Sequence, residues 1–143
     1  MKTLLLPLLV TLGLVAGCAS TRPSDADRLA LYEAHAGAPV NQIRYVDPMG
    51  WDRIDDQHVV LMMRPNESWL LTLSGPCLGW STGSPFLGLS SFNGMSLSRL
   101  DKVIVSGSQV SCLIQQIRPL DVKALRAAEG ALRERAAAQP SGT

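Results

Sequence analysis

The stretch VVLMMRPNESWLLTL, residues 59–73, decides the fold of this 143-residue chain. Residues 59–63 form an unbroken apolar run, which is typical of a central strand covered on both faces. The composition of 64–67 predicts a turn. In the segment that follows, 68–73, the odd-numbered side chains are expected to face the core. Because the two strands are so close in sequence, we expect them to pair as a hairpin.

A helix is predicted near each end of the chain. Ser24 followed three residues later by Asp27 is a capping arrangement, and the helix that it opens is expected to end at Gly37. Near the other end, Asp121 can cap a second helix. The apolar residues at helical spacing in that second helix are Val122, Leu125 and Leu132.

The remaining strands are predicted from short apolar runs and from alternation of apolar and polar residues. Between them, residues 78–98 are rich in glycine, serine and proline, and we predict a long surface loop or irregular edge there. The expected fold is therefore α+β, a single small domain with an antiparallel sheet of about five strands flanked by an N-terminal and a C-terminal helix. The predicted strand segments are 40–46, 51–54, 59–63, 68–73, 102–105 and 109–118.

The start of the chain has the composition of a processed export signal. Lys2 precedes an apolar run at 4–15, which is shorter than the about 20 residues that span a bilayer, and small residues at 16–17 lead to Cys18. This pattern resembles the signal of bacterial lipoproteins, which implies acylation of Cys18. Ala19 after the cysteine favours sorting to the outer membrane. An ordinary signal peptide cut near Ala19 and an uncleaved anchor are the alternatives.

Domain boundaries and charge follow from this signal. Removing 17 of the 143 residues leaves 126, the size of one small domain. Loss of Lys2 leaves 12 basic residues against 12 acidic ones, with no block of like charge, and this argues against a nucleic-acid partner. The expected parts are a signal peptide at 1–17, a lipidated N-terminus and linker at 18–27, the α+β domain at 28–136 and a disordered tail at 137–143.

Two cysteines remain besides Cys18, and we expect them to form one disulfide. Cys77 and Cys112 would meet an oxidising compartment after export, where thiols of this kind pair. The alternative is a redox-active or metal-binding pair, but their spacing lacks the close C-x-x-C arrangement of either.

Catalytic patterns in the sequence are weak. Residues 79–83 match G-x-S-x-G, but glycine and proline surround the motif and both histidines precede it, so we predict a loop. Asp55, Asp56 and His58 offer metal-ligand chemistry, although a polar hairpin turn is the simpler interpretation. We therefore predict no cofactor, no resident metal and no catalytic residue.

The three tryptophans are the other candidates for contact with a ligand. Trp69 is expected to be a core residue because it lies in a predicted strand. Trp80 lies in the glycine-rich segment, where packing and exposed contact are equally compatible with the sequence. Trp80 is therefore our candidate ligand-contact residue.

Motifs spread over most of residues 28–128 resemble those of the DUF6491 family of small uncharacterised bacterial lipoproteins. The resemblance implies an exported, disulfide-containing domain, and it implies no known activity. It is weakest over 78–98. The motifs are Arg44-Tyr45, Gly50-Trp51, Arg64-Pro65-Asn66-Glu67, Leu70-Leu71, Gly75-Pro76-Cys77, Asp101-Lys102-Val103, Cys112-Leu113-Ile114 and Ile117-Arg118-Pro119-Leu120-Asp121.

Two functions are compatible with these features. The first is a non-enzymatic binding or structural module of the bacterial envelope, tethered to the membrane lipid by acylated Cys18, facing the periplasm, with an envelope protein or glycan as its partner. The alternative is a metal-dependent enzyme with a site near Asp55, Asp56 and His58.

Overall fold

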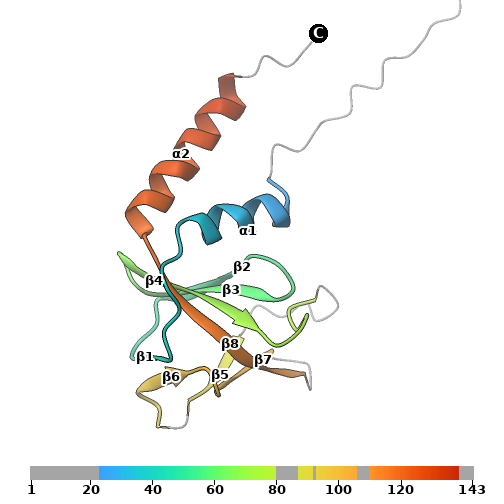
Figure 1. The fold of residues 1–143 in the computed structure, drawn as a ribbon, viewed down its shortest axis with the longest axis vertical. Coiled ribbons are helices and arrows are strands. Elements are labelled where there is room, and N and C mark those ends of the chain that lie inside the picture. The colour runs from blue at the N-terminus through green and yellow to red at the C-terminus, as the bar shows by residue number, and fades with distance from the viewer. Residues whose placement is uncertain (1–22, 80–86, 92, 106–109, 139–143) are drawn as a thin grey trace, which may run out of the picture.

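The computed structural model describes residues 23–79, 87–91, 93–105 and 110–138, which form two helices and eight strands (Figure 1). In chain order these elements are α1 (Asp25–Ala34), β1 (Gln42–Arg44), β2 (Gly50–Arg53), β3 (His58–Arg64), β4 (Glu67–Leu73), β5 (Leu87–Ser90), β6 (Ser96–Ser98), β7 (Lys102–Val105), β8 (Ser111–Leu120) and α2 (Val122–Ala138).

The strands form one antiparallel sheet of six and a second sheet of two. The larger sheet has the order β2-β3-β4-β8-β7-β5, and the smaller one pairs β1 with β6. The last strand of the sequence, β8, therefore lies inside the large sheet, between β4 and β7. The α+β class is confirmed, but the expectation of about five strands is too low.

The hairpin predicted from residues 59–73 is confirmed. β3 pairs with β4 in a register that places Leu61 opposite Trp69 and Val59 opposite Leu71, with an irregularity between Met62 and Arg64. The apolar run at 59–63 is covered on both sides, as its composition predicts.

Two hydrophobic clusters explain this double coverage. The inner cluster takes the odd-numbered residues of β3 and β4, and β1 and β6 close over it through Ile43 and Leu97. The second cluster, on the opposite face, takes Val60 and Leu70. The buried members of the inner cluster are Ile43, Val59, Leu61, Met63, Leu71, Leu73, Cys77, Leu78, Leu97, Val103, Val105, Ile114 and Ile117. The prediction that odd-numbered residues of β4 face the core is therefore right for the inner cluster, but Leu70 is buried as well, at 1% exposure.

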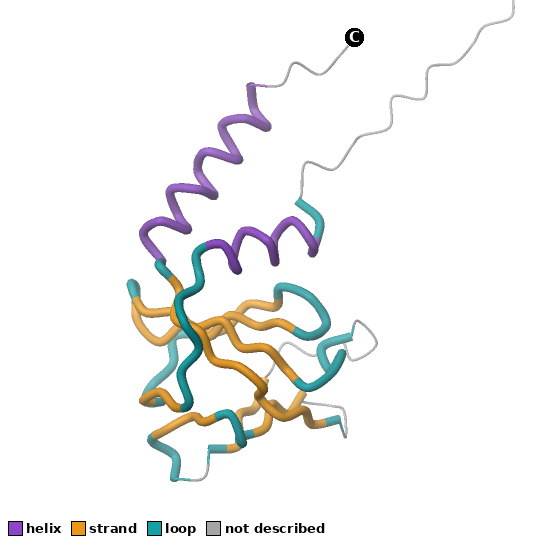
Figure 2. The backbone as a smooth tube through the Cα atoms, in the orientation of Figure 1, coloured by secondary structure: helices purple, strands orange, loops and turns teal. Residues whose placement is uncertain are grey.

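Both helices pack on the second cluster, on one face of the sheet (Figure 2). Tyr32 of α1 and Leu125 of α2 meet Val60, Leu70 and Leu120 there. The predicted helices are confirmed, but they flank the strands only in sequence and not on opposite sides of the sheet. Both helices share one face of the large sheet because the small sheet covers the other face, over the inner cluster.

Residues 78–98 are not simply a loop, because they contain β5 and β6. β5 adds to the edge of β7, and β6 pairs with β1. Gly88 faces Ile104 across this edge, where an added Cβ would lie 3.4 Å from the Ile104 carbonyl oxygen. Both β5 and β6 alternate apolar residues with small or polar ones, but over only four and three residues, which is too short a run to identify a strand from the sequence.

Candidate functional site

Two residues to which the sequence assigns roles lie outside the described part of the chain. These are Cys18, the predicted acylation site, and Trp80, the candidate ligand contact; most of the motif at 79–83 lies outside it too. Within the described ranges, no helix has the length and apolar character needed to cross a bilayer.

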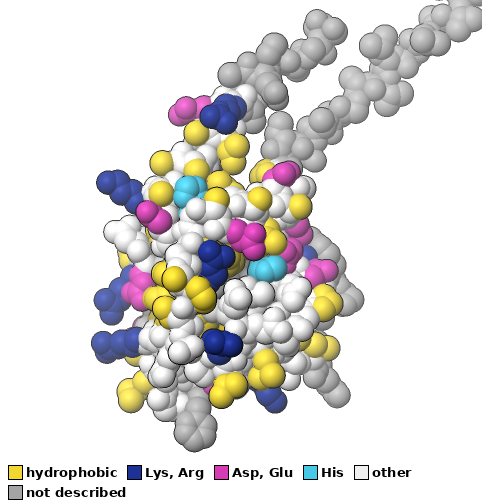
Figure 3. All heavy atoms as spheres, in the orientation of Figure 1, with side chains coloured by type: hydrophobic (Ala, Val, Ile, Leu, Met, Phe, Trp, Pro, Cys, Tyr) yellow, Lys and Arg dark blue, Asp and Glu magenta, His cyan; other side chains and the backbone are white. Residues whose placement is uncertain are grey.

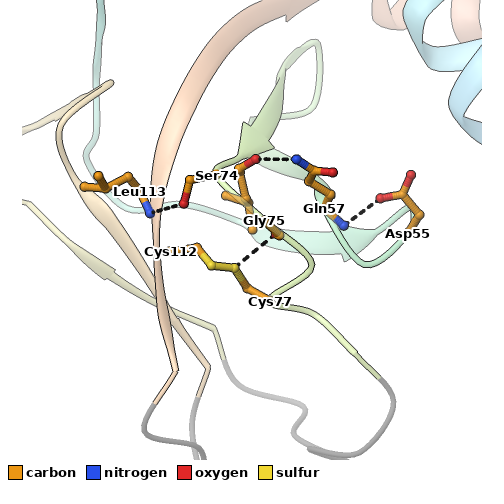
Figure 4. The surroundings of a disulfide bond; sticks show 8 residues. Asp55, Gln57, Ser74, Gly75, Cys77, Cys112 and Leu113 are labelled. Carbon is orange, nitrogen blue, oxygen red and sulfur yellow. Dashed lines mark hydrogen bonds between the residues drawn. A yellow bond between two sulfur atoms is a disulfide. The ribbon is translucent and has the colours of Figure 1, made fainter.

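The predicted disulfide between Cys77 and Cys112 is confirmed (Figure 4). Their Cα atoms lie 6.2 Å apart, with Cys77 buried in the inner cluster and Cys112 half-buried beside it. Hydrogen bonds join the same two chain segments, because Ser74 N–H donates to the Leu113 carbonyl (2.9 Å) and Leu113 N–H donates to Ser74 Oγ (3.2 Å). The disulfide thus continues the β4–β8 connection beyond the last paired residues.

Asp55 and His58 form a close pair in the turn between β2 and β3. Nδ1 of His58 lies 2.9 Å from both carboxylate oxygens of Asp55. Oδ1 of Asp55 also accepts the backbone N–H groups of Gln57 and His58, each at 2.7 Å. Burial acts to raise the pKa of Asp55, but these hydrogen bonds and the His58 ring outweigh it and lower that pKa.

Asp56 does not join this pair, because its carboxylate is held by Arg53. Nη2 of Arg53 lies 2.5 Å from Oδ1 of Asp56, and the same guanidinium donates to the Leu78 carbonyl at 3.0 Å and reaches Asp25 of α1 at 3.3 Å. Arg53 therefore ties the turn, α1 and the segment after β4 together.

The metal-site hypothesis gains no support from this geometry. The three predicted ligands are close in sequence, but Asp55 is turned toward His58 and Asp56 toward Arg53. In the described ranges, no three side chains of the metal-binding types gather into one group. The turn is better explained as a polar junction that fixes the β2–β3 hairpin.

A hollow of about 490 Å³ lies beside the first turns of α2, in the size range of ligand pockets. Asn66 lies in the β3–β4 turn, Leu120 ends β8, and the other lining residues belong to the start of α2. We call this the α2 hollow. Its lining residues are Asn66, Leu120, Asp121, Val122, Lys123 and Arg126.

Two hydrogen bonds fix the walls of the α2 hollow. Nη2 of Arg126 donates to the Pro65 carbonyl at 2.6 Å, which joins the helix to the turn. Oδ1 of Asp121 accepts the backbone N–H of Ala124 at 2.9 Å, as the predicted helix cap requires. Arg126 keeps its charge and its other N–H groups, so Lys123 and Arg126 are both cations that line the hollow.

The chemistry of the α2 hollow suits a hydroxylated ligand. Leu120 and Val122 are buried, at 7% and 8% exposure, and give it an apolar floor. The Lys123 ammonium supplies donors, and the Asn66 amide supplies both donors and an acceptor. An apolar surface bordered by a few polar groups is the usual composition of a small-ligand site.

The motifs on two sides of this hollow can be recognised in the sequence, but their proximity in space cannot. The turn at 64–67 and the cap at Asp121 are both recognisable motifs. The pairing of Ser68 with Leu120 brings them together, and that pairing depends on β8 lying beside β4.

Over the face drawn in Figure 3, basic and acidic side chains are interspersed, and neither sign forms a large patch.

A family model described as a family of unknown function (DUF6491) matches residues 1–136, and the chain belongs to this family. The family assignment predicted from the residue motifs is thus confirmed. No curated protein matches the chain, and no solved structure does.

Proposed function

We propose that this member of the DUF6491 family is a lipoprotein of the bacterial envelope whose folded domain binds a partner and catalyses no reaction. Acyl chains on Cys18 would hold the mature chain on the outer membrane, with the domain in the periplasm. More than one acyl chain is needed for stable anchoring, and the lipoprotein-type signal is what supports such a modification.

The disulfide is the observation on which this location chiefly rests. Cys77 and Cys112 are bonded, and structural disulfides persist mainly in exported proteins because the cytosol keeps thiols reduced. The disulfide and the signal pattern lie in different parts of the chain, and both favour export.

The α2 hollow is the proposed binding site, and a glycan of the envelope is the proposed ligand class. Hydroxyl groups of a sugar can accept hydrogen bonds from Lys123 and exchange them with Asn66, while the Leu120 and Val122 floor packs against the apolar face of the ring. Trp80 stays a candidate contact residue. If the titration described below finds no binding of glycans, an envelope protein is the alternative partner.

Metabolic labelling tests the anchor. The wild-type chain should incorporate labelled palmitate and sediment with outer membranes, whereas Cys18→Ser should do neither. Ser20→Ala is the matched control, since it changes a hydroxyl two residues away and leaves the cysteine in place. Absence of label from the wild-type chain, or membrane sedimentation of the Cys18→Ser variant, would refute the proposal.

Calorimetric titration with soluble peptidoglycan fragments tests the site. Lys123→Gln combined with Asn66→Ala should weaken binding by at least about tenfold, because loss of a hydrogen bond to a charged group costs roughly 1.5–3 kcal/mol. Lys102→Gln, on an exposed position of β7, is the control and should bind as the wild type does. Equal affinities for all three chains would exclude the α2 hollow.

A further inference from the structure

We propose that the second half of α2 lies on the lipid surface that carries the acyl chains, so that the helix face of the domain points toward the membrane. The small sheet and β7 would then point away from it. This inference rests on the proposed acylation of Cys18, and it adds an orientation that acylation alone does not specify.

The tether limits how far the domain can be from the lipid. Ser24 is the N-cap of α1, and five residues lie between it and Cys18. A chain spans at most about 3.3–3.6 Å per residue, so the start of α1 stays within roughly 20 Å of the acylated cysteine. A tether this short brings α1, rather than the far side of the domain, close to the membrane.

The second half of α2 is on the same side of the sheet as α1. Figure 1 shows both helices on one side of the strands, with β6 and β7 on the other. The first half of α2 packs against the domain, because Val122 and Leu125 are buried and the Tyr32 hydroxyl donates a hydrogen bond to Glu129 at 3.3 Å. Beyond that contact the helix leaves the body of the domain (Figure 2).

The projecting half of α2 is exposed to solvent, as a surface that contacts a membrane would be in the free domain. Residues 131–135 are all exposed, and Leu132 is 45% exposed although it continues the spacing of Val122 and Leu125. A helix of 17 residues is about 25 Å long. Its far end can therefore reach a surface at the distance that the tether allows.

The side chains of this half favour anionic phospholipid as the occupant. Arg133 is paired only loosely with Glu129, at 3.9 Å, and is 83% exposed, and Arg135 lies in the last turn. The projecting half itself has two basic residues against one acidic residue, Glu134, so its net charge is positive. Long basic side chains beside an apolar residue suit the boundary between headgroups and acyl chains.

Site-specific fluorescence on the acylated full chain tests this orientation. An environment-sensitive dye is attached to Leu132→Cys, or to Leu100→Cys as the matched control, since Leu100 is 83% exposed between β6 and β7. Each labelled chain is placed in phosphatidylethanolamine and phosphatidylglycerol vesicles with brominated acyl chains. We expect loss of emission and a blue shift at position 132, and neither at position 100.

A charge variant tests the role of the headgroups. Arg133→Gln with Arg135→Gln should reduce the loss of emission at position 132, and Lys102→Gln should not. Equal quenching at positions 132 and 100, or stronger quenching at 100, would overturn the orientation while leaving the anchor intact. A wild-type chain that takes up no palmitate would overturn both the anchor and this inference, so the two failures are distinguishable.

Discussion

Removal of the disulfide should cost this domain a large part of its stability. The double variant Cys77→Ala with Cys112→Ala removes a link between residues 35 positions apart. The chain-entropy model assigns about 4 kcal/mol to a loop of this length. A small domain has a free energy of unfolding of roughly 5–15 kcal/mol in total, so the variant should be strongly destabilised.

The loop closed by the disulfide explains why the effect should be large. It contains β5, β6 and β7, and these strands contribute Leu97, Val103 and Val105 to the inner cluster. In the native domain the link lies next to the Ser74 and Leu113 hydrogen bonds, so its loss removes few contacts of the folded state. We therefore expect the free energy of the unfolded chain, rather than that of the folded one, to change most.

Urea unfolding followed by tryptophan fluorescence measures this cost, because Trp51 and Trp69 are half-buried against the inner cluster. The Cys18→Ser chain is a suitable background, since it leaves no third thiol. Dithiothreitol should destabilise the parent chain by about as much as the double substitution does, and it should leave the double variant unchanged. A cost of less than about 1 kcal/mol in the double variant would refute the chain-entropy argument.

Three further predictions concern the core, a helix cap and acid stability. Leu71→Ala should lower the free energy of unfolding by about 2–5 kcal/mol, because Leu71 is fully buried. Leu132→Ala should change it by less than about 0.5 kcal/mol. Urea unfolding of both variants measures the two costs, and similar costs would contradict the assigned burial. Ser24→Ala breaks the capping box with Asp27 and should cost about 1 kcal/mol, seen as a lower midpoint of thermal unfolding by circular dichroism; an unchanged midpoint would contradict the cap. The folded state lowers the pKa of Asp55. The ionised carboxylate therefore stabilises the fold above the unfolded pKa of about 4, and this stabilisation is lost as the pH falls through the lower folded value. In urea titrations the stability advantage of the wild type over Asp55→Asn should shrink below about pH 4, and a constant difference from pH 6 to pH 2 would be inconsistent with this pKa shift.

The elements with strong local signals could be predicted from the sequence. The run at 59–63, the turn at 64–67 and the capping box at Ser24 each carry their own physical cause, and all three are present in the structure. The two cysteines could be paired because only two remained after Cys18 was assigned to the signal.

The missed elements depend on distant partners. β5 and β6 have the apolar alternation of strands, but they are only four and three residues long, and it is their pairing with β7 and β1 that defines them. The common placement of both helices also depends on the small sheet covering the inner face. The α2 hollow needed the register of β4 with β8, which no local pattern specifies.

The position of β8 has a consequence for the order in which the domain can be assembled. A polypeptide leaves the ribosome N-terminal end first, but the strand that joins β4 to β7 is the last one made. Until it arrives, the described strands can form only a three-stranded piece and separate pairs, each with open edges that can capture neighbouring chains. A message truncated before codon 111 should therefore give an aggregated or degraded product, not a smaller working domain.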